Sequence, residues 1–419
     1  MLSPYAYYKD HKGFVKNNSG FAYAVSDTCK VLASLDNEVF LLTQSGITTG
    51  FINDNVIVLK KRWVDILFHI HIRDLRYGFS AIKGSSISKI EKLKTIYYYL
   101  NRGYTEKIIK RIKPDVIHIQ SIGNYTLPYM MAARRCGVPF IVSNHGLASF
   151  LIDVDPKLKL IEGCFFEVAE KNNTIVTTVS NGIRKRISES YNLTGNNIEV
   201  IPNSISTIGI VDLEKLELLK KKLRITENDF VYICVGSISN RKNQMQVARV
   251  FSQIVREKKN CKLLFAGDGP QKEELREFIR SNNLEDYIIL LGNVEHIEMP
   301  YYYSLSNCTV LASVDEGFGL PVIEGYSQGV PTVLFGDLDA AKDISFQEST
   351  IVVMDRNDNS LAEGMLKAYS TTWDYQLIKK RSLEFTSESM GKKYLKALYQ
   401  AVDKGSTIQY EDITSLIVV

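Results

Sequence analysis

The sequence lacks the features that mark disulfide-rich proteins, proteins that bind metal through cysteine motifs, and membrane-spanning proteins. Its six cysteines are at least 27 positions apart, which excludes a CxxC metal motif and a compact disulfide framework. No apolar run approaches the ~18 residues that a membrane-spanning helix needs, and the polar first residues lack the apolar core of a secretory signal. We therefore expect a cytoplasmic protein whose cysteines are small buried side chains. They are Cys29, Cys136, Cys164, Cys234, Cys261 and Cys308.

Several enzyme signatures are missing as well. The chain has no P-loop, no GxSxG elbow and no HExxH zinc motif, and it has no internal repeat or low-complexity segment. With 419 residues, 45% of them hydrophobic and 23% charged, it is typical of a globular protein. At roughly 150 residues per domain, we expect two or three domains.

Positive charge is concentrated in the first half. Residues 1–205 hold 26 Lys and Arg against 17 Asp and Glu, whereas the remainder carries a net charge of −5. Residues 60–113 alone contain 14 basic and 4 acidic side chains, interleaved with aromatic residues such as Trp63 and Phe68. This stretch suits phosphate groups or an anionic membrane surface, and we expect no nucleic-acid partner.

Short apolar, β-branched segments alternate with helical periodicity along the chain. Candidate strands lie at residues 38–43, 115–119, 139–143, 174–179, 230–235, 262–266, 287–291, 308–312 and 331–335. Predicted helices include residues 22–35, 88–113, 244–258, 271–282 and 320–328. This order predicts an α/β fold of two doubly wound parallel-sheet domains that face a central cleft, with ligands at the carboxyl ends of the strands.

The most informative segment is residues 315–325, DEGFGLPVIEG, which directly follows a candidate strand. Its glycines allow a close approach of the backbone, and Pro321 is well placed at the start of a helix, where free N–H groups bind phosphate or sugar hydroxyls. Glu316 lies in the loop and Glu324 lies eight positions later in the helix. Each carboxylate can accept hydrogen bonds from vicinal hydroxyls, one set from a hexose and the other from a ribose.

This segment resembles the signature of the retaining family-4 glycosyltransferases of the GT-B fold (glycosyl transferases group 1), two glutamates separated by seven residues. The resemblance implies an N-terminal acceptor domain of residues 1–205 and a C-terminal donor domain of residues 206–389, with turn residues at 202–205 between them. It also implies that the final helix, residues 390–401 and onward, packs back onto the first domain. The implied donor-binding residues of the segment are Gly317, Phe318, Gly319, Leu320 and Glu324, with Glu316 as a catalytic residue.

A second element supports the resemblance at residues 235–244, VGSISNRKNQ, after the strand at 230–235. The resemblance implies that Lys242 and Arg241 bind the diphosphate of the donor. Fixed cations there stabilise the negative charge that develops on the leaving group. Many relatives have an arginine where this chain has Ser237, beside Gly236. A front-face mechanism is implied, in which the departing phosphate takes the proton of the acceptor hydroxyl.

Weaker signals extend the predicted site to both halves. In the second half they are Gly267 at a strand end, Val294 near the nucleobase and Asn203 at the domain boundary. In the first half, Gly20 resembles a glycine loop that faces the donor, and His145 follows a strand at the place where relatives have a histidine near the sugar. We assign structural roles to the remaining histidines of interest: His69, His71, His118 and His296.

Two segments imitate the DxD metal motif of the other glycosyltransferase fold, at residues 153–155 and 337–339. Neither fits an architecture in which lysine and a helix start neutralise the diphosphate, so we predict no required metal and no cofactor beyond the nucleotide sugar. Two alternatives remain open. A sugar-nucleotide epimerase of the same architecture would need its own acid and base carboxylates, and a noncatalytic carbohydrate-binding subunit would have lost the phosphate-gripping residues.

The basic segment indicates the acceptor. We expect Lys60, Lys61 and Arg62, beside Trp63 and Phe68, to contact an anionic membrane, which favours a lipid-linked glycan acceptor and a role in cell-surface polysaccharide assembly at the inner face of the membrane. The alternative is that the helix at 88–113 buries an apolar stripe that includes residues 90 and 93, and that its Lys-rich outer face only maintains solubility.

Overall fold

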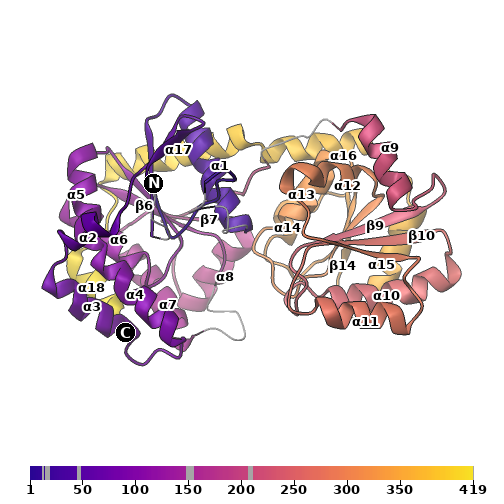
Figure 1. Cartoon of the computed structure of the whole chain (residues 1–419), viewed down its shortest axis with the longest axis horizontal. Helices are drawn as coiled ribbons and strands as arrows, with labels where there is room; N and C mark the ends of the chain where they lie inside the picture. The colour runs from indigo at the N-terminus through magenta and orange to yellow at the C-terminus, as the bar shows by residue number, and fades with distance from the viewer. Residues whose placement is uncertain (12–13, 15–18, 45–48, 148–154, 206–210, 419) are drawn as a thin grey trace. The chain divides into compact units, whose positions relative to one another are not determined.

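The computed structural model describes residues 1–11, 14, 19–44, 49–147, 155–205 and 211–418, and the chain forms two compact α/β units (Figure 1). Unit 1 comprises Met1–Pro202 and Ser387–Val419, and unit 2 comprises Asn203–Thr386. Each unit has its own mainly parallel sheet. The prediction of two Rossmann-like, parallel-sheet domains is therefore confirmed.

The sheet of unit 1 has the strand order β3-β4-β2-β1-β5-β6-β7-β8. Its paired strands run parallel, except that β3 and β4 are antiparallel. The strands β5 and β6 are buried along their whole length, as expected of strands covered on both faces. The strands are β1 (Leu2–Ser3), β2 (Val39–Thr43), β3 (Phe51–Asn53), β4 (Val56–Val58), β5 (Ile117–Gln120), β6 (Phe140–Asn144), β7 (Val176–Thr178) and β8 (Ile198–Val200).

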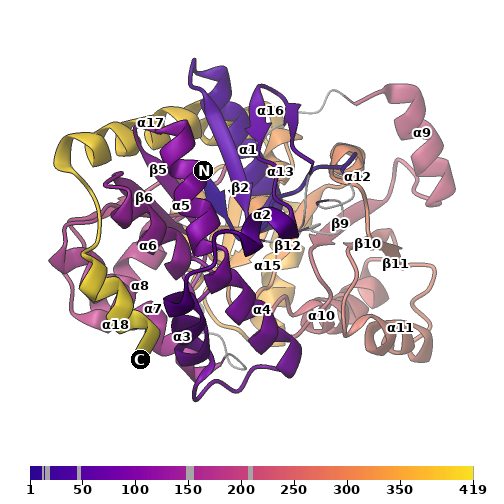
Figure 2. The same ribbon diagram turned by 60° about the vertical axis from the view of Figure 1, so that its left-hand side comes forward.

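Helices α1 (Gly20–Ser34) and α17 (Ser387–Lys404) pack together in unit 1 (Figure 2). Val25 of α1 and Tyr394 of α17 belong to one apolar cluster with Leu41 of β2. The two helices approach so closely that a Cβ atom at Gly391 would lie 2.2 Å from a methyl group of Val31. The predicted return of the C-terminal helix to the first domain is thereby confirmed.

The remaining helices of unit 1 connect its strands, and the last of them follows α17. Within the described residues they are α2 (Trp63–Leu67), α3 (Ile72–Ile82), α4 (Lys89–Leu100), α5 (Arg102–Ile112), α6 (Leu127–Arg135), α7 (Pro156–Lys171), α8 (Asn181–Tyr191) and α18 (Tyr410–Val418).

The sheet of unit 2 has the order β11-β10-β9-β12-β13-β14, and all its paired strands are parallel. Alternate residues of β9 serve opposite faces: Val231 and Ile233 pack in a cluster with Met299, whereas the ring of Tyr232 lies 6.2 Å from that of Phe251. The strands are β9 (Phe230–Val235), β10 (Cys261–Ala266), β11 (Ile288–Gly292), β12 (Cys308–Leu311), β13 (Thr332–Phe335) and β14 (Thr350–Val353).

Helices cover both faces of this sheet. Figure 1 shows α10 (Gln244–Glu257) and α11 (Lys272–Ser281) on one side and α12 (Met299–Ser304) and α13 (Leu320–Ser327) on the other. The remaining helices described in unit 2 are α9 (Leu213–Lys222), α14 (Ala341–Ile344), α15 (Asp358–Ser370) and α16 (Tyr375–Ser382). Among the described residues, none of the helices in either unit combines the length and apolar character needed to span a membrane.

The prediction of one helix over residues 88–113 is wrong. The helix α4 ends at Leu100 and α5 begins at Arg102, because the side chain of Asn101 competes for the backbone and donates a 2.6 Å hydrogen bond to the Tyr97 carbonyl. The predicted core stripe is also wrong at its start: Ile90 and Leu93 are 67% and 68% exposed.

The prediction that Lys61 contacts a membrane is also wrong, because its side chain does not reach the surface. Its side chain is 2% exposed, and its Nζ donates a 2.7 Å hydrogen bond to the Thr43 carbonyl and another to the Gln44 carbonyl. Burial lowers the pKa of Lys61 to about 7. The flanking Lys60 and Arg62 are exposed, and Arg62 donates to Asp65 at 3.0 Å. Lys61 therefore joins the end of β4 to the end of β2 and is unavailable to a membrane.

Candidate active site

The loop between β12 and α13 is shaped by its glycines. Gly319 has φ of 87°, a left-handed conformation that favours glycine, and it immediately precedes α13. Pro321 is the second residue of that helix, where its missing N–H costs no hydrogen bond. The ring of Phe318 turns into the core, 5.7 Å from the ring of Phe385, so this residue supports the loop. Leu320 is the first residue of α13, and Gly317 lies in the loop before it.

Glu316 of this loop forms an ion pair with Lys242. The two side chains are only 13% and 11% exposed, and the Ser313 hydroxyl lies 3.4 Å from the same Glu316 oxygen. Burial acts to raise the pKa of Glu316, but Lys242, Arg241 and Ser313 outweigh it and hold this pKa below its ordinary value. Glu316 is therefore a carboxylate at neutral pH.

Arg241 stands beside this pair in the turn after β9. Its guanidinium donates a 3.2 Å hydrogen bond to the carbonyl of Asp315. The backbone of the turn is closed by the Lys242 N–H, which donates to the Ser239 carbonyl at 3.0 Å. Two cationic side chains and the start of α13 thus meet around one carboxylate. Such an arrangement is chemically suited to an anionic group that lies next to hydroxyls.

Two strand ends that carry a glycine, those of β9 and β10, lie next to each other here. Gly236 has φ of 137°, and a Cβ atom on it would lie 3.3 Å from Cε of Lys242. A Cβ atom on Gly267 would lie 2.1 Å from the Gly236 carbonyl oxygen, so this approach requires glycine. The Ser237 carbonyl is held by a 3.0 Å bond from the Gln244 amide, and Val294 packs at the edge of the apolar core. These predicted residues therefore lie along one edge of the sheet.

Glu324 has two protein partners that the sequence analysis missed. The Tyr303 hydroxyl donates to one of its oxygens at 2.7 Å, and the His296 ring lies 3.2 Å from the other. Burial, together with Glu324, raises the pKa of Tyr303, so this phenol stays a donor. A small cavity of about 20 Å³ adjoins Glu324 and is lined also by Ile205, Met299, Pro300 and Ser327. His296 lies two residues after Val294, and that spacing was the only signal available for it.

The predicted residues of unit 1 form a separate set. His145 follows β6, and its Nε2 lies 2.7 Å from the Gln120 side-chain oxygen at the end of β5. Its ring packs edge-on against Phe21 at 5.0 Å. Gly20 begins α1, so the glycine loop and His145 meet through Phe21. His118 is buried, which lowers its pKa, and it contacts the Ser143 hydroxyl at 2.6 Å, in keeping with a structural role.

The remaining predicted residues are Asn203 and the two DxD-like segments. Asn203 is half-buried at the start of unit 2. Of the DxD-like segments, Asp153 and Val154 lie outside the described residues, whereas Asp155 accepts a 2.6 Å bond from Ser85. Asp337 pairs with Arg356 at 2.6 Å. In the part of the chain that the structure describes, there is no cluster of three His, Cys, Asp or Glu side chains placed to hold a metal ion.

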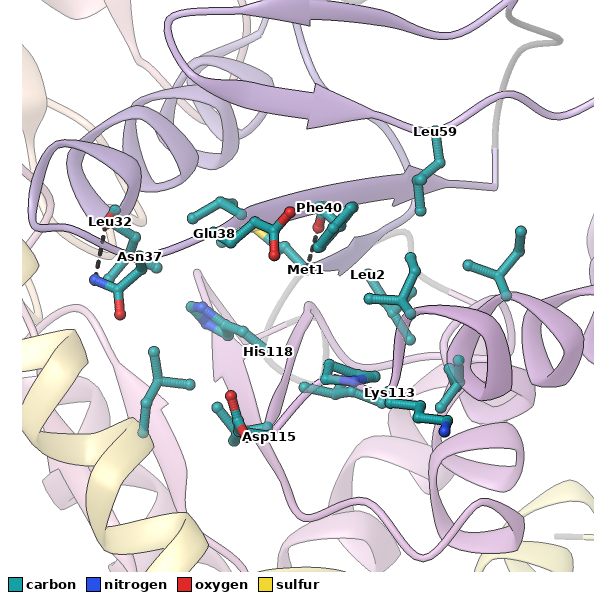
Figure 3. A pocket seen from close by; sticks show the side chains of 18 of the residues that line it. Met1, Leu2, Leu32, Asn37, Glu38, Phe40, Leu59, Lys113, Asp115 and His118 are labelled. Atoms are coloured by element: carbon teal, nitrogen blue, oxygen red, sulfur yellow. Dashed lines mark hydrogen bonds between the residues drawn. The ribbon is translucent and has the colours of Figure 1, made fainter.

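A larger cavity of about 250 Å³ lies in unit 1, at the amino ends of β2 and β5 (Figure 3). Its lining includes Glu38 and Val39 at the start of β2 and Ile117 at the start of β5. His145 follows the carboxyl end of β6, and β6 is parallel to β5. Within unit 1, this cavity therefore lies at the opposite ends of the strands from His145.

The fold and these contacts together define a class of protein. Two Rossmann-like units, a C-terminal helix that returns to the first, and a glutamate–lysine pair at a helix start are the attributes of a GT-B enzyme. Residues 19–207 match the family described as Glycosyltransferase Family 4, and residues 216–383 match Glycosyl transferases group 1. The chain belongs to this glycosyltransferase family and transfers a sugar from a nucleotide sugar.

Individual relatives agree with this class. The chain is similar to the alpha-monoglucosyldiacylglycerol synthase of Streptococcus pneumoniae, with 25% identity over 70% of this chain and 68% of that enzyme. It is also similar to an Escherichia coli UDP-Gal:alpha-D-GlcNAc-diphosphoundecaprenol alpha-1,3-galactosyltransferase, with 28% identity over 54% of this chain; the chain spans 59% of that enzyme's length. A glycosyltransferase structure from Rickettsia africae has a TM-score of 0.69 and 16% identity, covering 96% of this chain and 97% of the other, and shows the shared fold.

Proposed function

We propose that this enzyme transfers a hexose-type sugar, with retention of anomeric configuration, from a UDP-sugar to a hydroxyl group of a lipid-linked glycan. The observation that carries the transfer chemistry is the nearly buried Lys242–Glu316 pair beside the start of α13. A cation and a carboxylate beside the start of a helix suit a sugar joined to a diphosphate.

Each side chain has a distinct role in this proposal. Lys242 and Arg241 stabilise the negative charge on the departing diphosphate, and Glu316 accepts hydrogen bonds from the sugar hydroxyls. Glu324 binds the ribose, and Tyr303 and His296 orient its carboxylate. His145 contacts the transferred sugar. The bond between the anomeric carbon and the phosphate oxygen breaks, the acceptor oxygen bonds to the same face, and its proton passes to the phosphate.

The lipid-linked acceptor is supported by the relatives and by charge. The two curated relatives are named for a diacylglycerol glycolipid and for a diphosphoundecaprenol glycan. The basic segment of residues 60–113 suits an anionic membrane, with the correction that Lys61 is not part of the contact surface. We therefore place the enzyme at the cytoplasmic face of the membrane, in cell-surface polysaccharide assembly.

A donor screen followed by a transfer assay tests this function. UDP-, GDP- and ADP-sugars are compared by thermal shift, and the best donor is then offered with a polyprenyl diphosphate glycan or with the same glycan free of lipid. We expect stabilisation by a UDP-sugar, and an α-linked product on the lipid-linked acceptor that NMR identifies. Conversion of the donor sugar without acceptor would favour the epimerase alternative. Stabilisation by no nucleotide sugar would favour the noncatalytic subunit.

A further inference from the structure

The helix α3 has its apolar side turned outward. Ile72, Leu75 and Phe79 lie on one face of the helix and are 80%, 37% and 58% exposed. The opposite face carries Asp74, which is fully buried and accepts a 2.5 Å hydrogen bond from the buried Arg102. Because this ionic contact holds the polar side inward, the helix cannot rotate to bury its apolar residues.

The helix α4 repeats the same pattern. Its exposed residues Ile90 and Leu93 have the same spacing as Ile72 and Leu75 in the apolar stripe of α3. The partly exposed Tyr97 corresponds to Phe79 and completes the stripe of α4. Its inward side holds the buried Thr95 and Tyr99. Both helices therefore carry an isoleucine, a leucine three positions later, a basic residue directly after the leucine and an aromatic residue seven positions after the isoleucine. The two sets are Ile72, Leu75, Arg76 and Phe79, and Ile90, Leu93, Lys94 and Tyr97.

The two stripes face the same side. The helices are joined by residues 83–88 and pack against each other where a Cβ atom at Gly78 would lie 3.1 Å from Cα of Ile96. Each of these contact residues lies six positions after the isoleucine that begins its stripe. Two antiparallel helices that touch at equivalent positions are related by a twofold axis perpendicular to the plane that contains both helices. Such an axis leaves each face of the helix pair on its own side. The stripes of α3 and α4 therefore lie on the same surface of the pair. Figure 2 shows the two helices side by side.

The surface continues onto α2 and is rimmed by positive charge. The Trp63 ring, in a residue 53% exposed, lies 4.6 Å from the Tyr97 ring. Residues 72–94 contain six basic and two acidic side chains; of the acidic ones Asp74 is buried and Glu91 pairs with Lys94 at 2.6 Å. A second copy of this surface would bring like charges together, whereas lipid phosphates are complementary to it.

We propose that the α3–α4 hairpin is a membrane-insertion surface, whose apolar stripes enter the acyl boundary of an anionic bilayer while its basic residues contact the lipid phosphates. This proposal rests on the membrane contact of the proposed function and specifies it further. It attributes membrane binding to insertion of apolar side chains as well as to charge. A purely electrostatic contact would be lost at high salt, but an inserted apolar face keeps part of its affinity.

The two tryptophans allow a direct test. Trp373 lies in unit 2, so the variant Trp373→Phe leaves Trp63 as the sole tryptophan reporter beside the hairpin. With vesicles of phosphatidylglycerol and phosphatidylcholine, we expect the Trp63 emission to shift to the blue and to be quenched by lipids brominated in the acyl chain. Part of the binding should persist at high salt. Trp63 emission without acyl-chain quenching would contradict insertion.

Matched variants identify the residues that carry the binding. The triple variant Ile72→Ser, Phe79→Ser and Ile90→Ser should reduce vesicle affinity about 1,000-fold, since each residue contributes roughly tenfold. The control Leu213→Ser with Leu218→Ser removes side chains of similar exposure, 73% and 67%, from unit 2 and should bind as the wild type does. Circular dichroism verifies that both variants fold.

Two outcomes would overturn the proposal: wild-type vesicle binding by the triple variant, or sedimentation showing self-association that the triple variant abolishes, without vesicle binding. These measurements use neither donor nor acceptor. If the enzyme glycosylated only soluble acceptors yet inserted into vesicles, the lipid-linked acceptor would be wrong and the insertion surface would stand. If it glycosylated a detergent-solubilised lipid acceptor without binding vesicles, the reverse would hold.

Discussion

Replacing Lys242 with methionine is the most direct test of the candidate site. Methionine keeps the apolar stem that lies over Gly236 but removes the ammonium group that pairs with Glu316. If Lys242 stabilises the departing diphosphate, kcat at saturating donor should fall at least ~100-fold, which is ~2.7 kcal/mol of transition-state stabilisation. A radiolabel transfer assay under saturating conditions measures this.

The same change should reduce stability, and the size of the loss follows from burial. Glu316 is only 13% exposed, so removing its partner leaves an almost buried carboxylate with Ser313 and the nearby Arg241 as its remaining polar support. Breaking a pair of this kind costs ~3–5 kcal/mol. Because the folded-state pKa of Glu316 lies below its ordinary value, the stabilisation is present at neutral pH and is lost as the pH falls through that pKa. The cost of Lys242→Met should therefore shrink in acid.

A double variant separates folding from catalysis. Adding Glu316→Gln to Lys242→Met replaces the stranded charge by a neutral amide, so the free energy of unfolding should recover while kcat stays low. As a control, Lys220→Met removes a partner of Glu227 that is 83% exposed, and it should change stability by no more than ~1 kcal/mol and leave activity intact. Near-wild-type turnover in Lys242→Met, or activity restored in the double variant, would refute the assignment.

The other expectations concern the glutamates, metal and Lys61. In calorimetry, Glu324→Ala should weaken the binding of UDP and of the UDP-sugar equally. Glu316→Ala should leave UDP binding unchanged but abolish sugar transfer. The reverse pattern would mean that the two glutamates have exchanged roles. Activity should survive EDTA, and a complete loss that manganese restores would show that a metal is required. Because burial lowers the folded-state pKa of Lys61 from 10.5 to about 7, the unfolded chain binds more protons between these values. Lys61 should thus make stability rise with pH there, by at most ~1.4 kcal/mol per unit, and denaturant titrations of Lys61→Met should lack this contribution.

Sequence patterns predicted the elements that local chemistry determines. The strand at residues 230–235 has its predicted limits, because a fully apolar run ends at Gly236. The helix that carries Glu324 begins at Leu320, since glycine and proline define its start. The strands β1, β3, β4 and β14 were not predicted. They are two to four residues long, and they form through pairing with distant neighbours that a short pattern does not record.

The sequence could not indicate which way a periodic face points. Ile90 and Leu93 have the spacing of a core stripe, yet the tertiary contacts of α4 place Tyr99 inside instead. Likewise, charge alone grouped Lys61 with its exposed neighbours, although the carbonyls that hold it come from β2. His296 received a structural role because a lone histidine has no pattern, and its contact with Glu324 depends on the packing of two separate elements.

Unit 1 is built from two separate segments of the chain, and this determines which fragments of the enzyme can fold on their own. Unit 2 is one continuous segment, inserted between Pro202 and Ser387 of unit 1. Ser406, between the last two helices, bonds to both backbone groups of Phe140 and to the Ile175 N–H, so this part of the chain secures the neighbouring strands β6 and β7. A fragment that stops near residue 205 would leave these strands uncovered and aggregate. A fragment in which a short linker replaces residues 203–386 would keep all of them. Exchanging the excised segment for that of a relative would then show whether this segment determines the preference for a donor.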